Sequence, residues 1–186
     1  MTTLLFLLAV SNRFNAAEVQ GKATIEGRST ANAVVWLEGA VKSKPMTGAV
    51  VDQRDRQFLP HVSVVTTGTK VSFPNSDVVY HNVFAHYRAK RFDLGMYPKG
   101  AKKDVTFDKP GVVSIFCNVH SDMSAYVIVV DSPYFAVSDK SGKFTIKGVQ
   151  PGKYTLHAWH ESGRTAEFAT EVRASGETVQ VNLARN

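Results

Sequence analysis

The sequence predicts an all-β protein, and three observations support this fold class. Short runs rich in β-branched and aromatic residues recur along the chain after residue 18. Turn residues separate these runs, as in KPG (109–111), DKSG (139–142), QPG (150–152) and ASG (174–176). No segment has the apolar period of an amphipathic helix. Short strands at this spacing are typical of a β-sandwich or a β-barrel.

The N-terminus has the character of an export signal. LLFLLAV (4–10) is an apolar run, and NAA (15–17) offers small residues for cleavage near Ala17, although no Lys or Arg precedes the run. The run is too short to span a bilayer. We therefore expect residues 1–17 to be a signal peptide and the protein to be periplasmic or otherwise exported, without stable membrane insertion. An apolar N-terminal strand is the alternative.

The candidate strands follow one another from residue 33 to residue 183. They are AVVWL (33–37), VSVV (62–65), TKVSF (69–73), VVYHNVF (78–84), KDVTF (103–107), VVSIFC (112–117), AYVIVV (125–130), KFTIK (143–147), KYTLHAW (153–159), AEFATEV (166–172) and TVQVNL (178–183). One stretch differs from them. HYRAKRFDLGMYPKGAKK (86–103) is polar and has six Lys or Arg against one Asp. We interpret it as a long connection that could contain a short helix, and either as a solvated face or as a docking patch.

The composition permits a packed core and limits the partners. Hydrophobic residues make up 44% of the 186 residues, so the fold does not depend on a metal. The net charge of +6 suits an acidic protein partner, an anionic membrane or nucleic acid. No basic run with interleaved aromatic residues is present, so we expect no nucleic-acid partner. Cys117 is the only cysteine, which excludes an intrachain disulfide.

The ligand types of a mononuclear copper site gather around this cysteine. FCNVHSDM (116–123) places His120 three residues after Cys117, and Met123 three residues after His120. A thiolate, two imidazoles and a weakly held thioether form the ligand set of an electron-transfer copper site. His81, in FPNSDVVYHNVF (73–84), offers the second imidazole. The alternative is a buried structural cysteine beside unrelated histidines.

The segment from about residue 48 to residue 130 resembles the cupredoxins, the small blue copper proteins of the plastocyanin and amicyanin type. QFLPHVSVVTTGTKVSFPNSDVVYHNVF (57–84) is similar to the first half of the family, and FDKPGVVSIFCNVHSDMSAYVIVV (107–130) is similar to the second half. The resemblance implies a cupredoxin Greek-key β-sandwich that holds one copper per chain, cycling between Cu(I) and Cu(II), on His81, Cys117, His120 and Met123. It also implies that the side chain of Asn82 ties the two ligand-bearing loops together by a hydrogen bond.

The last third of the chain resembles a second family. YFAVSDKSGKFTIKGVQPGKYTLHAWHE (134–161) is similar to the small β-sandwich of carboxypeptidase regulatory-like (transthyretin-like) modules. That pattern normally begins with a strand pair such as VQGKATIEGRSTANAVVWLEG (19–39), which here precedes the cupredoxin segment. We therefore expect a copper domain (46–131) inserted into a smaller sandwich made of 18–45 and 132–186. A tandem order, with 18–39 adding edge strands to the copper domain, is the alternative.

Four further side chains are weaker candidates for metal ligands. His61 could approach the copper pocket, but we expect it on the rim or packed in a strand. Met96 could compete for the axial position, but its distance from the ligand loop disfavours this. His157 and His160 lie at strand spacing and could form a second metal site, but half-exposed strand histidines are the better interpretation.

Together these features predict an exported electron carrier that is not an enzyme. We expect a monomer whose partner is a redox protein such as a c-type cytochrome or a periplasmic oxidoreductase. A copper-binding or delivery protein would use the same ligands, and an interaction module could hold the copper structurally. Tight retention of copper in both oxidation states favours the carrier, whereas ready loss of Cu(I) favours delivery.

Overall fold

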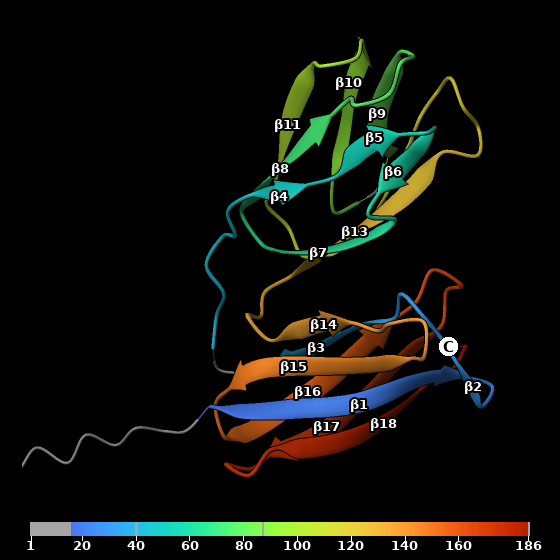
Figure 1. Cartoon of the computed structure of the whole chain (residues 1–186). Helices are drawn as coiled ribbons and strands as arrows, with labels where there is room; N and C mark the ends of the chain where they lie inside the picture. The colour runs from blue at the N-terminus through green and yellow to red at the C-terminus, as the bar shows by residue number, and fades with distance from the viewer. Residues whose placement is uncertain (1–15, 40, 87, 186) are drawn as a thin grey trace, which may run out of the picture.

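Residues 16–39, 41–86 and 88–185 are described in a computed structural model of the chain. They form eighteen strands and no helix, so the predicted all-β fold class is confirmed. The strands divide between two β units, drawn one above the other in Figure 1. The predicted signal segment lies outside the described residues except for its last two, of which Ala17 begins the first strand. In the described part of the chain, no helix is long and apolar enough to cross a membrane.

The upper unit in Figure 1 contains all strands between residues 49 and 130. A five-stranded sheet has the order β10-β9-β12-β13-β7, a three-stranded sheet has the order β11-β8-β4, and β5 and β6 form a hairpin. The bounds are β4 (Ala49–Val50), β5 (Asp52–Arg54), β6 (Gln57–Leu59), β7 (Val62–Thr66), β8 (Thr69–Pro74), β9 (His81–His86), β10 (Arg91–Tyr97), β11 (Lys102–Phe107), β12 (Gly111–Phe116) and β13 (Ser124–Val130).

The lower unit combines the two ends of the described chain. One sheet has the order β15-β1-β18 with β2 paired to β1, and the other has the order β14-β3-β16-β17. The bounds are β1 (Ala17–Ile25), β2 (Arg28–Ser29), β3 (Val34–Glu38), β14 (Phe135–Val137), β15 (Lys143–Val149), β16 (Gly152–Trp159), β17 (Thr165–Val172) and β18 (Glu177–Leu183).

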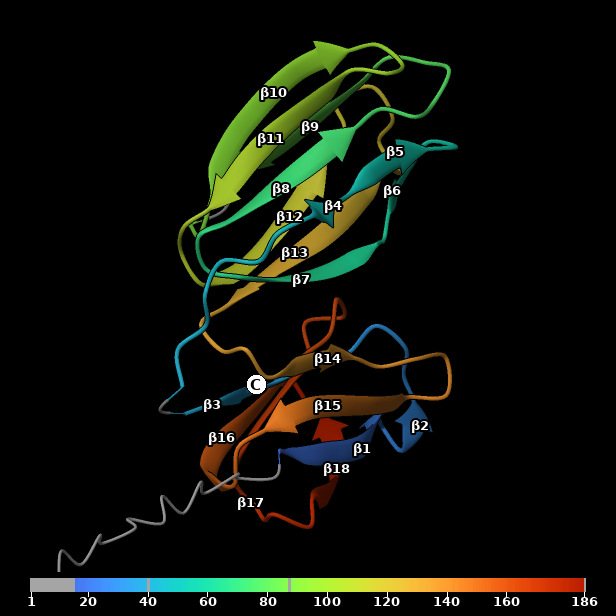
Figure 2. The ribbon, with the colours of Figure 1, turned by 60° about the vertical axis from the view of Figure 1, so that its left-hand side comes forward.

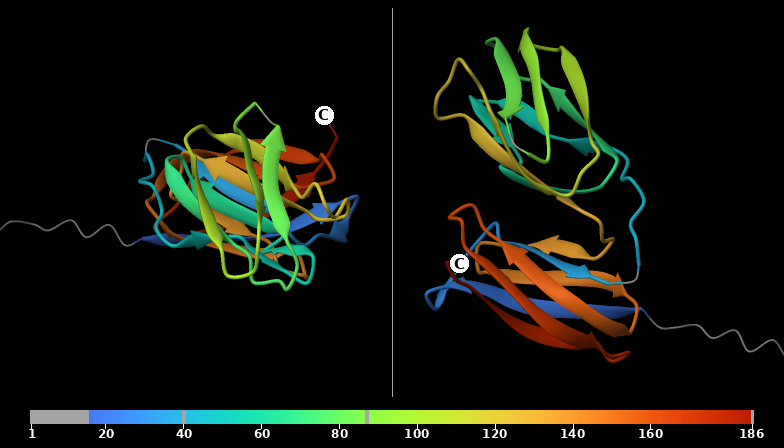
Figure 3. Two further views of the ribbon diagram at one scale, coloured as in Figure 1. Left: turned by 90° about the horizontal axis from the view of Figure 1, so that it is seen from above. Right: turned by 180° about the vertical axis from the view of Figure 1, so that it is seen from behind.

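Strands from the first 38 residues occupy central places in the lower unit. β1 lies between β15 and β18, and β3 lies between β14 and β16. The turn before β15 allows the close approach of β1, because Gly142 has a φ of +78° and a Cβ there would lie 2.5 Å from the carbonyl oxygen of Ala23. The chain thus leaves the lower unit after β3, builds the upper unit and returns at β14. The two connections run along the same side of the molecule (Figure 3).

The basic stretch 86–103 is not the long connection that we expected. It contains β10, an edge strand paired with β9, and the start of β11, and the part that the structure describes has no helix there. Phe92 and Leu94 are half-buried against the core, while the charged residues that alternate with them point to solvent. This period of two is that of a strand with one solvated face, and the charged and polar composition of the stretch concealed it.

Each unit has its own hydrophobic core, and a third cluster joins them. Val34 of the lower unit packs with Val62, Ile128 and Val130 of the upper unit. The rings of Tyr126 and Trp159 add to this contact, with centroids 5.1 Å apart. In Figure 2 the contact lies where β7 and β13 face β14. The loop described next leads directly into β13, the strand that contributes Tyr126, Ile128 and Val130 to this junction.

Candidate metal centre

Three of the predicted ligands come from a short hairpin loop between β12 and β13. Phe116 and Ser124 are the last paired residues of the hairpin, so Cys117 and Met123 face each other across its mouth. The amide of Cys117 donates to the carbonyl of Met123 at 3.2 Å, and the amide of Met123 donates to the carbonyl of His120 at 3.0 Å. These two bonds fix the backbone of the loop, and with it the places from which the side chains of Cys117 and His120 start.

The fourth predicted ligand, His81, begins β9 and is fully buried. The strand predicted at 78–84 starts here and not at residue 78, because the preceding residues form a turn held by side chains. In this turn the amide of Asp77 donates to Asn75 Oδ1 at 2.9 Å, and Asn75 Nδ2 donates to the carbonyls of Val79 and Tyr97. The turn delivers His81 to the loop that carries Cys117.

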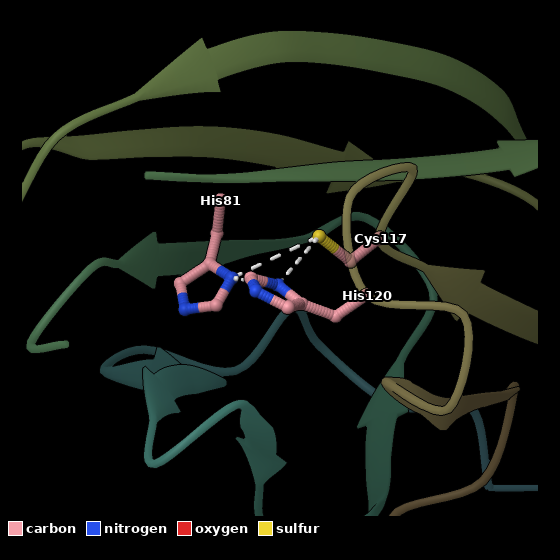
Figure 4. A group of neighbouring side chains, drawn as sticks. All are labelled: His81, Cys117 and His120. Carbon is pink, nitrogen blue, oxygen red and sulfur yellow. Dashed lines mark hydrogen bonds between the residues drawn. The ribbon is translucent and has the colours of Figure 1, made fainter. Parts of the chain in front are cut away.

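The imidazoles of His81 and His120 converge on the thiol of Cys117 (Figure 4). The Nδ1 atoms of both rings lie 3.8 Å from Cys117 Sγ and 3.1 Å from each other. Cys117 is 4% exposed, and His120 is half-buried at the edge of the site. Among the described residues, this is the one group of three or more His, Cys, Asp or Glu side chains that lie close enough together to hold a metal ion.

The three distances fit one small cation. A point in the plane of the donor atoms that lies about 2.0 Å from both nitrogens lies about 2.2 Å from the sulfur, and such lengths are typical of metal–imidazole and metal–thiolate bonds. Met123 is buried in the same core cluster as Cys117. Two imidazoles, a thiolate and a nearby thioether suit copper, whereas zinc takes four strong ligands and seldom methionine.

Asn82 connects the two segments that carry the ligands. Its Oδ1 accepts a hydrogen bond from the backbone amide of Asn118 at 2.7 Å, and its Nδ2 donates to Asp93 at 3.3 Å. Because Asn82 follows His81 and Asn118 follows Cys117, the bond fixes β9 relative to the start of the loop. Such bonds hold ligand geometry in metal sites.

Asp77 is a residue of the site that the sequence analysis did not single out. Its Oδ2 lies 3.0 Å from His81 Nε2, on the side of the ring away from Cys117. The hydrogen bond from His81, followed by the one from the Arg56 amide, lowers the pKa of Asp77 to about 2. An acidic residue four positions before a candidate histidine ligand was the signal in the sequence.

The electrostatics of the site favour a neutral His120. Burial lowers the pKa of His120 below its usual value, and the nearby charges of His81 and Arg56 lower it further, against the opposing effect of Asp77. A metal binds the unprotonated imidazole. The site therefore keeps His120 in its binding form over a wider pH range than a solvated histidine would have.

The weaker candidate ligands lie elsewhere. His61 Nε2 is 2.6 Å from Glu161 of the lower unit, and Met96 is exposed on β10. His157 stacks on Trp36, with Nε2 2.9 Å from Glu38, and His160 Nδ1 lies 2.9 Å from the hydroxyl of Ser162. His157 and His160 are not part of the metal-binding group found in the described residues.

Cupredoxins are among the solved structures that are similar to this chain. A purple cupredoxin from Nitrosopumilus maritimus is 21% identical over 44% of this chain and 99% of its own length, with a TM-score of 0.41. A reduced amicyanin mutant is 24% identical over 51% of this chain and 99% of its own, with a TM-score of 0.41. A copper-containing nitrite reductase from Thermus scotoductus SA-01 is 23% identical, with a TM-score of 0.44, over 51% of this chain but only 25% of its own.

One family model matches the chain, and it differs from the module expected for the lower unit. It is described as domain II of polysaccharide lyase family 4 and covers residues 111–181, less than half of the sequence. The match is therefore not to a carboxypeptidase regulatory-like module. It begins at β12 of the upper unit and ends within β18 of the lower unit. Comparison with curated proteins gave no match.

Proposed function

We propose that the protein is an exported electron carrier with one copper per chain. The observation that carries this proposal is the convergence of His81, Cys117 and His120 on one point at metal-bond distances. When bound, copper supplies a one-electron couple between Cu(I) and Cu(II). The chain supplies a thiolate and two imidazoles that suit both oxidation states, and hydrogen bonds that hold the ligand segments in place.

The surroundings of His120 support electron exchange with a partner. Val119 precedes this half-buried histidine and is 49% exposed, while Tyr80, next to His81, is 55% exposed. Val78 is also exposed, so apolar side chains gather along the segments that lead into the site. An apolar rim suits a small transient contact, because it excludes water where the two proteins meet. The proposed partner is a c-type cytochrome or a periplasmic oxidoreductase.

The direct test is the visible spectrum and electrochemistry of the copper-loaded protein, with copper counted per chain. We expect one copper, an intense thiolate-to-copper band in the oxidised protein and reversible reduction. The fraction of copper left after exposure to a Cu(I) chelator separates the two copper functions. Retention supports the carrier, and rapid loss of Cu(I) would instead support copper delivery.

Met123→Gln should keep copper bound and lower the reduction potential. The axial ligand of such a site is long and weak, so the thiolate and imidazoles hold the metal. An amide oxygen is a harder donor than a thioether and favours Cu(II). The measurement is voltammetry of the variant and the wild type. Complete loss of copper would show that Met123 is a principal ligand or that the site is of another type.

The six basic residues of the stretch fall into three pairs, and the two exposed pairs permit a matched test of docking. Lys90 pairs with Asp108 at 2.8 Å, and Lys103 lies over the ring of Tyr97, so both are engaged. Lys99 and Lys102 are exposed at the end of β10 and the start of β11, where Ala101 and Gly100 hydrogen-bond with Asn75 near the site. Arg88 and Arg91 are exposed near His86, at the opposite end of β9.

Charge reversal at Lys99 and Lys102 should slow electron transfer to an acidic partner at low salt. Charges near the docking face raise the encounter rate, and salt screens them beyond about 8–10 Å. Arg88→Glu with Arg91→Glu makes the same change in net charge far from the site and should have the smaller effect. Transfer rates are measured for both double variants as ionic strength rises. Equal slowing by the two pairs would show that net charge, and not docking at this face, controls the rate.

A further inference from the structure

The carboxylate of Asp77 contacts three donors in the upper unit. Oδ2 lies 3.0 Å from His81 Nε2 and accepts a hydrogen bond from the backbone amide of Arg56 at 2.8 Å. Oδ1 accepts from the amide of Val78 at 2.7 Å. Asp77 is only 8% exposed, so these bonds replace most of its contact with water. A buried carboxylate with this many donors has a fixed orientation.

The Arg56 amide is presented by the tight turn between β5 and β6. Asp55 and Arg56 both have a positive φ, 52° and 57°, in the left-handed region that non-glycine residues seldom adopt. In this turn the Arg56 amide points to the carboxylate of Asp77, 21 residues away in the sequence. Oδ1 of Asp77 accepts from the next residue in the chain, whereas Oδ2 contacts His81 and the Arg56 amide. The side chain thus does more than stabilise its own turn.

The contact with Asp77 determines which nitrogen of His81 has the proton. An ionised carboxylate can only accept a hydrogen bond, so His81 Nε2 must donate. In a neutral imidazole the other nitrogen is then unprotonated, and its lone pair is available. That nitrogen, Nδ1, is the one that faces Cys117 Sγ and His120 Nδ1.

We propose that Asp77 is a positioning residue that holds His81 in the Nε2–H form with Nδ1 directed into the site, and that its charge lowers the reduction potential of a copper bound there. A negative charge hydrogen-bonded to a histidine ligand makes the imidazole a stronger donor. A stronger donor stabilises the more highly charged Cu(II) over Cu(I). The effect on the potential rests on the proposed function, whereas the effect on the proton of His81 does not require a metal.

The test begins with the metal-free wild-type protein and ¹⁵N NMR of its imidazoles. We expect the proton of His81 to reside on Nε2. A proton mainly on Nδ1 would overturn the proposal, whatever the behaviour of any variant. Because this measurement needs no copper, it decides the role of Asp77 even if the protein turns out not to bind copper as proposed.

The variant is Asp77→Asn, which keeps the shape of the side chain. Its amide has one acceptor oxygen and one NH₂ donor, so it cannot accept from His81, Arg56 and Val78 in the same way. We expect the Nε2–H form of metal-free His81 to lose its predominance and the affinity for Cu(II) to fall about 10–100-fold. If the affinity for Cu(I) stays constant, this fold-change equals a rise of about 60–120 mV in a one-electron potential.

Asp104→Asn is the matched control. Asp104 is exposed on β11 of the same unit, and its carboxylate accepts from the hydroxyl of Ser72 at 2.7 Å. The substitution removes the same charge without touching a candidate ligand, so the His81 tautomer and the potential should stay as in the wild type. Equal shifts of the potential in the two variants, or no change of tautomer and potential in Asp77→Asn, would overturn the proposal. Absence of the thiolate-to-copper band in the wild type would instead refute the proposed function.

Discussion

Cys117→Ser should abolish the intense visible band of the oxidised copper-loaded protein. The band requires charge transfer from a thiolate sulfur to Cu(II), and the chain has no other cysteine that could replace it. A serine hydroxyl stays protonated at neutral pH and is a poor ligand, so binding by the two imidazoles alone should be much weaker. A band that survives the substitution would refute the assignment of Cys117 as a ligand.

The same variant should remain folded. Cys117 is one small member of a core that includes larger side chains such as Phe73, Phe107 and Ile115, and serine has nearly the same volume as cysteine. The new hydroxyl would lie near the Nδ1 atoms of two histidines, which offer it hydrogen-bond partners. We therefore expect the free energy of unfolding to change by only about 1 kcal/mol. Far-UV circular dichroism and chemical denaturation of the metal-free proteins measure this change.

His61→Gln is the control for the loss of the band. This histidine belongs to the same unit, but its ring nitrogens contact the carbonyl of Ser124 and the carboxylate of Glu161. It is therefore expected to leave the band and the copper content unchanged, whereas His120→Gln should weaken both. A loss of the band in His61→Gln would show that His61 shapes the site through β13.

The loop from Cys117 to Met123 could be predicted because its chemistry is local. The ligand types are rare, they lie within seven residues, and the β-branched runs on both sides indicate a hairpin that would hold them together. His81 was harder to assign, because 36 residues separate it from Cys117, so the sequence could offer its imidazole but local spacing could not place it beside the thiol. The role of Asp77 depends on the orientation of the His81 ring and on an amide from the β5–β6 turn. The local signal is the spacing of Asp77 four residues before His81, and this spacing specifies neither the ring orientation nor the amide.

Other features were missed because tertiary contacts and not local patterns determine them. β10 is an edge strand, and its exposed residues could be charged without loss of stability, so the stretch read as a polar connection. The contact between His61 and Glu161 joins residues 100 positions apart in two different units. A histidine with no apparent role in the sequence thus lies at the junction between the units. Long-range pairs of single polar residues leave no periodic pattern from which they could be predicted.

Leu37→Ala should strongly destabilise the lower unit. Leu37 is fully buried in β3, a strand with neighbours on both sides in its sheet. Its amide donates to the carbonyl of Tyr134, and its carbonyl accepts from the hydroxyl of Ser132, so the backbone cannot easily close around a truncated side chain. A cavity in such a place costs about 2–5 kcal/mol of unfolding free energy. Leu59→Ala is the matched control, since Leu59 in β6 of the upper unit is 41% exposed and its truncation should cost about 0.5 kcal/mol or less.

Two probes follow the two units in this experiment, and one of the tryptophans, Trp159, also contacts Tyr126 across the junction. Both tryptophans of the chain, Trp36 and Trp159, lie in strands of the lower unit, whereas the copper band reports the ligand loop of the upper unit. Unfolding by denaturant is followed by tryptophan fluorescence and by the visible band of the copper-loaded protein. In Leu37→Ala the fluorescence transition should move to lower denaturant while the band persists, because the core around Cys117 is separate from the core around Leu37. Equal shifts of the fluorescence transition in the two variants would contradict the place of β3 in the core of the lower unit. A band lost together with the fluorescence change would show that the junction makes the two units unfold as one.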